Sequence, residues 1–158
     1  MLVVADSSAL LALAACDSLT LLDALFEEVR VPGAVFRECT VQDKPYTSVL
    51  RSYLQGRVDD VDLMEFVVAA SGLGRGELEA MALYKRLRAD RLLIDDGRAR
   101  RVARINDVDV IGSLGVLILA KSRNIIPAVS PLLDRIKAAG NHLSDELVSE
   151  ALRLSGEA

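Results

Sequence analysis

The stretch GELEAMALYKRLRADRLLIDDGRARRVARI, residues 76–105, decides the fold that the sequence predicts. Its first part, GELEAMALYKRLRAD, predicts a helix with acidic residues at its beginning and basic residues at its end, as the helix dipole prefers. RLLI at 91–94 is a short apolar run that predicts a buried strand. The basic segment DGRARRVARI predicts a second helix. A buried strand between two helices is typical of a parallel sheet covered by helices.

The same alternation extends on both sides of this stretch. Short apolar strands are predicted at 2–5, 29–31 and 108–111, with an interrupted strand within 56–63, while 63–71 fits either a helix or a strand. Further helices are predicted over residues 9–16, 19–29, 33–39, 45–55, 112–123, 129–140 and 143–154. Ser7 or Ser8 is expected to cap the helix that follows the first strand. We therefore predict an α/β fold, a three-layer α/β/α sandwich with a central parallel sheet.

Length and composition limit the class of protein. The 158 residues suit one domain over residues 1–158, which we expect to end in a helix pair at about 129–155. Hydrophobic residues make up 51% and aromatics only 4%, so the core must be aliphatic. A net charge of −4 argues against a protein that coats nucleic acid non-specifically. The lack of a long uncharged apolar stretch and of a basic leader predicts a cytoplasmic protein without a membrane partner.

The few cysteine and histidine residues exclude several chemistries. Cys16 and Cys39 form no CxxC motif, and we expect reduced thiols that fill the core. His142 is the one histidine and lies in the C-terminal part of the chain. Serine- or cysteine-type catalysis usually needs a histidine base. Any catalysis is therefore expected to depend on carboxylates.

Acidic residues follow the predicted strand ends, or lie at the start of the helices that begin beside them. In a parallel sheet, strand C-termini and helix N-termini share one edge of the molecule, so these side chains are expected to converge. Neighbouring carboxylates repel one another, and a divalent cation relieves that repulsion. Mg²⁺ or Mn²⁺, which prefer oxygen ligands, would activate a water for attack on phosphorus. The candidate acids are Asp6, Glu38, Glu77, Glu79, Asp95 and Asp96.

Each acid also has a structural interpretation. Glu77 and Glu79, placed in the first turn of their helix, suit its dipole, and Asp95 suits the N-cap of the next helix. Glu38 suits a solvated helix face. Glu77 and Glu79 are two residues apart, so they cannot point the same way on a helix. The sequence leaves open which member of this pair, and which of Asp95 and its neighbour, serves a metal.

Four arginines crowd the short helix after the acid pair, at positions Arg98, Arg100, Arg101 and Arg104. A solvated face that pairs with nearby acids is one interpretation. The other is a path for RNA, in which Arg98 and Arg101 contact the phosphate backbone.

Three segments resemble the PIN-domain proteins, namely VVADSSALLALA at 3–14, GRGELEAMALYKRLRADRLLIDDGRARRVA at 74–103 and VIGSLGVLILAKSRNIIP at 110–127. The resemblance covers nearly the whole chain. It is nearest to a prokaryotic PIN-like branch with the pattern GExEA…LLIDD…ARRVA…GTLGVLLLAK, related to the VapC-type toxin ribonucleases.

The resemblance implies a Mg²⁺- or Mn²⁺-dependent ribonuclease, and many small members of the family are toxins inhibited by a cognate antitoxin. The partners expected are RNA, such an antitoxin protein and a second copy of the chain in a homodimer. Among the acids, the resemblance assigns catalytic positions to Asp6, Glu38, Glu79 and Asp96, with Glu77 and Asp95 beside the last two as further metal ligands. It matches Ser8 and Ser113 to the small hydroxyl residues that line such sites.

The sequence departs from the toxins in two ways. The third acid, Glu79, is a glutamate where they mostly have aspartate, and the C-terminal helix pair makes the chain longer than the smallest of them. Both departures weigh against toxin activity more than against the fold.

Three other functions compete with the ribonuclease. FVVAAS at 66–71 followed by GLGRG at 72–76 resembles the strand and glycine turn of a dinucleotide-binding module, with Asp95 as the ribose ligand, but the spacing is GxGxG. A phosphotransfer fold would use Asp6 as nucleophile, but Ser8 stands where its partner Asp belongs. The last alternative is a PIN-like module that has lost cleavage and only binds nucleic acid or protein.

Overall fold

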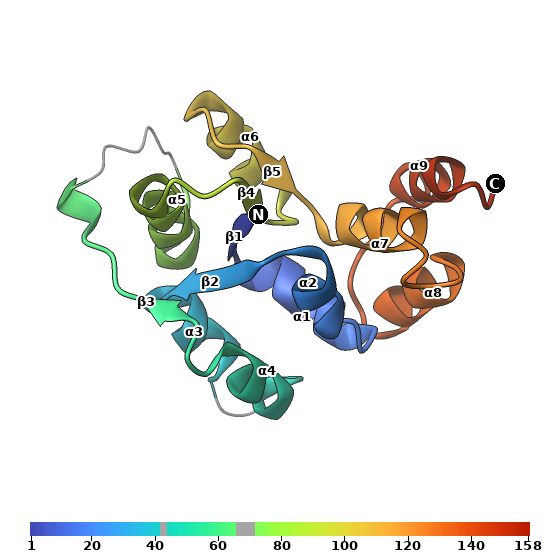
Figure 1. The fold of residues 1–158 in the computed structure, drawn as a ribbon, viewed down its shortest axis with the longest axis horizontal. Coiled ribbons are helices and arrows are strands. Elements are labelled where there is room, and N and C mark those ends of the chain that lie inside the picture. Colours follow the sequence, from blue (N-terminus) through green and yellow to red (C-terminus); the bar gives the residue numbers. More distant parts are fainter. Residues whose placement is uncertain (42–43, 66–71) are drawn as a thin grey trace.

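The sheet of the computed structural model, which describes residues 1–41, 44–65 and 72–158, is parallel throughout. Its described strands are β1 (Leu2–Ala5), β2 (Glu28–Pro32), β3 (Val58–Asp59), β4 (Arg91–Leu93) and β5 (Val110–Ile111). They pair in the order β3-β2-β1-β4-β5, so β1 lies in the centre (Figure 1). The predicted parallel sheet is confirmed.

Helices flank this sheet as a three-layer α/β/α fold, as predicted. The described helices are α1 (Ser7–Ala15), α2 (Thr20–Leu25), α3 (Gly33–Cys39), α4 (Thr47–Leu54), α5 (Arg75–Leu87), α6 (Gly97–Ile105), α7 (Ser113–Ser122), α8 (Ser130–Ala138) and α9 (Asp145–Ser155). A 3₁₀ turn, η1, spans Leu63–Glu65. Helix α5 contacts β1, β2, β4 and α3, while α2 contacts β2 and α7.

The core is aliphatic because the strands are continuous apolar runs that helices cover. Val3 and Val4 of β1 and Leu92 and Leu93 of β4 are fully buried. Cys16 and Cys39 are free and buried within this core, as expected. Such burial, at roughly 25 cal/mol per Å² of apolar surface, is the main favourable contribution to the fold.

Helices α7, α8 and α9 gather at one end of the molecule (Figure 1). Helix α9 contacts α7, and α8 contacts α1. The two helices lie within residues 129–155, where the sequence predicts a C-terminal helix pair, and α9 packs beside the helix that follows β5.

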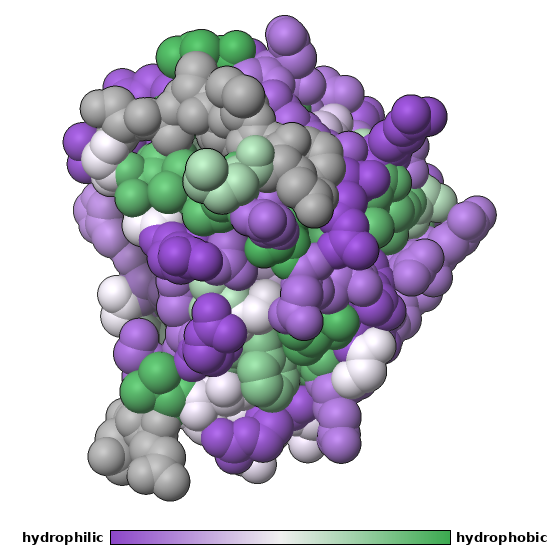
Figure 2. Space-filling model, turned by 90° about the vertical axis from the view of Figure 1, so that its left-hand side faces the viewer, coloured by the Kyte–Doolittle hydropathy of each residue, from purple (hydrophilic) through white to green (hydrophobic). Residues whose placement is uncertain are grey.

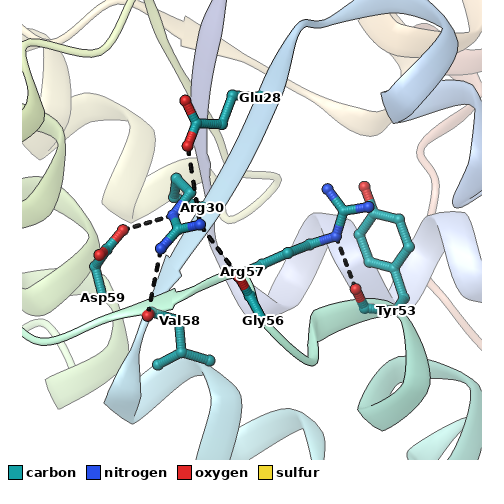
Figure 3. Close-up of polar contacts among 7 residues, drawn as sticks. All are labelled: Glu28, Arg30, Tyr53, Gly56, Arg57, Val58 and Asp59. Carbon is teal, nitrogen blue, oxygen red and sulfur yellow. Dashed lines mark hydrogen bonds and ion pairs between the residues drawn. The ribbon is translucent and has the colours of Figure 1, made fainter.

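Arginine side chains fix the short edge strand β3 (Figure 3). Arg30 of β2 donates from Nε to Asp59 Oδ2 at 2.6 Å and also reaches the carbonyls of Gly56 and Val58, at 3.2 and 3.5 Å. Arg57 lies over the ring of Tyr53, with its guanidinium carbon 4.4 Å from the ring centroid. These contacts compensate for the small number of backbone hydrogen bonds that a two-residue strand can make.

Three local expectations need correction or restriction. Asp6, rather than Ser7 or Ser8, caps α1, because its carboxylate accepts the amide of Ser8. Glu79 lies beyond the first turn of α5, since that helix begins at Arg75. The FVVAAS segment of the dinucleotide alternative, 66–71, falls outside the described residues.

The face of the molecule in Figure 2 carries mostly hydrophilic residues, with hydrophobic ones in separate patches between them. No helix within the described ranges has the length and apolarity that a membrane crossing requires.

Candidate functional site

The strand order brings the candidate acids to the C-terminal edge of the sheet. Asp6 follows the central strand β1, and Asp95 and Asp96 follow β4 on one side of it. Glu38 lies on α3, which follows β2 on the other side. The strand order therefore places the elements that carry these acids at one edge, with Asp6 in the middle.

Asp6 is almost fully buried, with only 2% of its surface exposed, although it carries a carboxyl group. Its Oδ2 accepts the Ser8 hydroxyl at 2.9 Å and the Ser8 amide at 3.3 Å. Its Oδ1 is buried and receives no hydrogen bond from any residue that the structure describes. Burial, with a smaller contribution from the carboxylate of Glu77, raises the pKa of Asp6 to about 6 against the opposing effect of the Ser8 hydrogen bonds. The role of Asp6 as the N-cap of α1 accounts for the hydrogen bonds of Oδ2, but it does not account for the burial of Oδ1.

Glu38 comes toward this position from α3. The Ser7 hydroxyl donates to Glu38 Oε2 at 2.9 Å. The carboxylate also rests on Gly76 in the first turn of α5, where an added Cβ would lie 2.5 Å from Glu38 Oε1. Any side chain at position 76 would displace Glu38. Helices α1, α3 and α5 therefore meet around this carboxylate.

The two glutamates of α5 have different environments. Glu79 is buried, with Oε1 accepting the amide of Ala34 at 3.2 Å and Oε2 accepting Arg75 Nε at 2.5 Å. Glu77 is half-buried and accepts the amide of Gly74 through Oε2 at 2.5 Å. That contact uses an amide at the N-terminus of α5, where the dinucleotide alternative requires a pyrophosphate.

Asp95 is fully engaged by the start of α7. Its Oδ1 accepts the amide of Ser113 and its Oδ2 accepts the Ser113 hydroxyl, both at 2.6 Å. The amide of Asp95 donates to Ser8 Oγ at 3.0 Å, and that hydroxyl in turn donates to Asp6. A chain of hydrogen bonds thus joins α7, β4 and Asp6. Gly112 allows it, because a Cβ there would lie 3.0 Å from Asp95 Oδ1.

Asp96, and not Asp95 as one interpretation of the sequence had it, is the N-cap of α6, since its Oδ1 accepts the amide of Ala99 at 2.8 Å. The arginines of that helix differ in exposure. Arg98, Arg101 and Arg104 are exposed, whereas Arg100 is half-buried. None of the ion pairs formed among the described residues involves these four side chains. Exposed arginines without such ion pairs fit a solvated surface as well as a path for RNA.

The structure does not gather the acids into one compact group. Within 1–41, 44–65 and 72–158, no three His, Cys, Asp or Glu side chains are close enough to hold a metal ion. Glu79 and Asp95 have both oxygens bonded to protein donors, as described above. Mg²⁺, however, is usually held by one or two carboxylates together with waters. Among the described residues, the buried Oδ1 of Asp6 is the carboxylate oxygen whose missing partner a divalent cation would supply.

Sequence reasoning missed three residues of this edge. Ser7 was considered only as a cap, yet it orients Glu38. Gly76 and Gly112 provide close approaches to Glu38 and Asp95. The sequence signal for these close approaches was a glycine in the first turn of a helix or at its N-cap. Other residues can also begin a helix, so a glycine there can mark a place where a side chain would not fit.

The comparison with protein families gives one result. A family model described as a PIN domain, DUF3368, matches residues 2–157. Comparisons with curated proteins and with solved structures give no match.

Proposed function

We propose, from the premise that this chain belongs to the PIN-domain family, that it is a metal-dependent endoribonuclease that hydrolyses RNA phosphodiester bonds. PIN domains are generally nucleases that use divalent metals. The finer parts of the proposal are RNA as the substrate and Mg²⁺ or Mn²⁺ as the metal.

One observation carries the proposal, namely the buried Oδ1 of Asp6. A buried carboxylate oxygen without a partner is costly, because it has lost its hydration and gained nothing in return. A purely structural cap would not need this second oxygen to be buried. A divalent cation bound to it would compensate for the lost hydration.

Under this proposal, some residues of the sheet edge bind the cation and others orient the residues that bind it. Asp6 would bind the cation, with Glu38, Glu77 and Asp96 as further carboxylates at the same sheet edge. A cation there supplies an activated water and neutralises charge on the phosphate. Ser8 fixes the orientation of Asp6 through its hydrogen bonds. Glu79 and Asp95 stay candidates, but each would first have to release the donors that now hold it.

The proposed toxin role is narrower. It depends on the resemblance of the sequence motifs, and it implies a cognate antitoxin that inhibits the chain in the cytoplasm. We also propose, on the same resemblance, that two copies of the chain form a homodimer. Growth arrest on expression, relieved by a co-expressed neighbouring protein, is the outcome that this role requires.

A PIN-like module that binds without cleaving is the second candidate function. The observation in its favour is that Glu79 and Asp95 are each saturated by protein donors. A chain that had lost its metal would be expected to use its carboxylates in this way.

The experiment that tests the proposal is cleavage of single-stranded RNA in Mn²⁺ by wild type and by Asp6→Ala. We expect the variant to lose at least a hundredfold in rate while its circular dichroism spectrum is unchanged. Asp134→Ala is the matched control, because Asp134 is exposed on α8, away from this edge. Equal rates in wild type and Asp6→Ala, or no Mn²⁺ binding by calorimetry, would reject the nuclease and favour the binding module.

A further inference from the structure

A pocket of about 600 Å³ adjoins the candidate site on the side of the C-terminal helices. One end is formed by the site itself, with Ser8, Asp95 and Ser113 among its lining residues. The walls come from α1, α7 and α9, which lie far apart in the sequence, and α7, α8 and α9 surround this end of the molecule in Figure 1. Its size is in the range of small-ligand sites, roughly 300–1,000 Å³.

The walls of this pocket are aliphatic. Leu11 of α1, Ile118 of α7 and Ala151 of α9 line it. Glu150 of α9 is a charged residue among these lining positions. A ligand that fits such a lining has flat apolar faces and a polar edge.

Arg100 stands at the polar end of the pocket. Within the described ranges its guanidinium forms no ion pair and no side-chain hydrogen bond. It lies beside Gly112, where an added Cβ would be 2.8 Å from Arg100 Nη1. Asn141 and His142 line the pocket as well. Asp95 and Asp96 line the same pocket, so this end offers both hydrogen-bond donors and acceptors to a polar ligand edge.

We propose that this pocket receives an unpaired nucleobase of the RNA, next to the phosphate held at the carboxylate edge. The inference rests on the proposed function. A base has two apolar faces and a polar edge, and proteins that read RNA commonly bind bases that are splayed out of a single strand. Arg100 is placed to stack on the base or to contact its phosphate. The substrate is therefore single-stranded RNA, because a paired base cannot enter the pocket.

A protein segment fits these observations less well. Stable protein interfaces bury more than about 1,000 Å² with well-packed apolar anchors. Here one cavity of about 600 Å³ leads into the proposed cleavage site, which suits a single base joined to the phosphate that is cleaved.

The test uses short single-stranded RNAs that carry the fluorescent base 2-aminopurine at one position at a time, bound to the full chain in EDTA so that no cleavage occurs. We expect one position to change its emission strongly on binding, and an abasic nucleotide at that position to weaken binding about tenfold. The Ile118→Trp variant, which narrows the pocket, should abolish the emission change. The matched control Ile125→Trp should keep it, because Ile125 is partly exposed and does not line the pocket. Leu147→Glu is a second variant at a half-exposed wall residue, which should weaken binding without affecting folding.

Three outcomes would contradict the nucleobase pocket while leaving the nuclease proposal intact, and the third of them is a dimer. One is Asp6-dependent cleavage in Mn²⁺ with no position-specific emission change. The second is a change that Ile118→Trp and Leu147→Glu leave as in wild type. A concentration-dependent dimer lost in Ile118→Trp would identify the pocket as a protein interface instead. If RNA is neither bound nor cleaved, the pocket inference and the nuclease proposal both fail.

Discussion

The two carboxylate oxygens of Asp6 have different surroundings. Its Oδ2 stabilises the start of α1 by accepting the amide and hydroxyl of Ser8, as a structural cap does. Its Oδ1 is buried without a partner, and burial raises the pKa of the carboxyl to about 6. A residue chosen only for capping would not retain a buried charge. This difference is what we expect where stability has been given up for binding.

Asp6→Asn should therefore stabilise the metal-free protein. Asparagine keeps an acceptor oxygen for Ser8 and is as good a cap as aspartate, but it buries no charge. Relief of the buried charge is worth on the order of 1–3 kcal/mol, and a chain of this size gains about 2–4 °C in melting temperature per kcal/mol. Thermal scans in EDTA should show the variant melting above wild type.

In Mn²⁺, wild type should melt at a higher temperature than Asp6→Asn, which is the reverse of the order expected in EDTA. A ligand at a hundredfold excess over its dissociation constant stabilises the native state by about 2.7 kcal/mol, so wild type should gain several degrees and Asp6→Asn should gain far less. If the variant melts lower in EDTA and neither protein responds to Mn²⁺, Asp6 is a cap only.

At the scale of one element, α6 begins at Asp96 and carries a set of arginines. Arg98 and Arg101 are exposed, and none of the ion pairs of the described residues involves them. A helix that starts at the carboxylate edge and bears unpaired positive charge is well placed to guide a polyanion. The acidic net charge of the chain makes a local basic surface more necessary.

Neutralising two of these arginines should weaken RNA binding through its salt dependence. Each lost phosphate contact in single-stranded RNA lowers the slope of log affinity against log salt by about 0.7, so Arg98→Gln with Arg101→Gln should lower it by about 1.4. Fluorescence anisotropy titrations from low to moderate salt measure the slope. The control pair, Arg135→Gln with Lys137→Gln, removes the same charge from the exposed surface of α8 and should leave the slope unchanged. A slope equal to that of wild type in the α6 variant would assign these arginines to solvent.

The sequence predicted helices and strands correctly where hydrophobic or charged residues followed a strong local pattern. The apolar runs of β1 and β4 and the charge gradient of α5 identified these elements, because burial and the helix dipole act through neighbouring residues. The partner of each carboxylate was not predictable. Glu79 bonds to Ala34 and Asp95 bonds to Ser113 across the fold, and no local pattern encodes such pairings. The sequence therefore predicted which edge holds the acids, but not which acids remain available there.

The pocket belongs to the scale of the whole molecule, since its walls come from α1, α7 and α9. The helical periodicity of α9 predicted an apolar face without showing what that face would meet. The shape of the pocket depends on how α7, α8 and α9 are held together. One side chain near the end of the chain, Glu157, holds all three.

Glu157 replaces the cap that α8 lacks. It accepts the amides of Val129 and Ser130 at 2.8 and 3.1 Å, and Val129, the N-cap residue, offers no side-chain bond of its own. It also pairs with Lys121 of α7 at 3.0 Å and accepts the hydroxyl of Ser155, the last residue of α9, at 2.9 Å. The amide of Val129 and these other donors lower the pKa of Glu157 to about 2. A carboxylate so favoured in the folded state stabilises the fold only while it is ionised.

Glu157→Gln should therefore lower the melting temperature at neutral pH, by roughly 2–4 °C for a chain of this size. The difference from wild type should depend on pH with a definite sign. Because folding lowers the pKa of Glu157, its contribution is complete above the ordinary value of 4.5 and is lost as pH falls from there toward about 2. Melting curves of the two proteins between pH 7 and pH 2.5 should converge at the acid end, whereas the exposed control Asp134→Asn on α8 should follow wild type throughout. A constant gap across this range would mean that the charge of Glu157 does not hold the three helices together. The gap should also narrow in 1 M salt if the partly exposed pair with Lys121 dominates, and should persist if the backbone amides do, because salt screens an ion pair that solvent reaches more than it screens a helix cap.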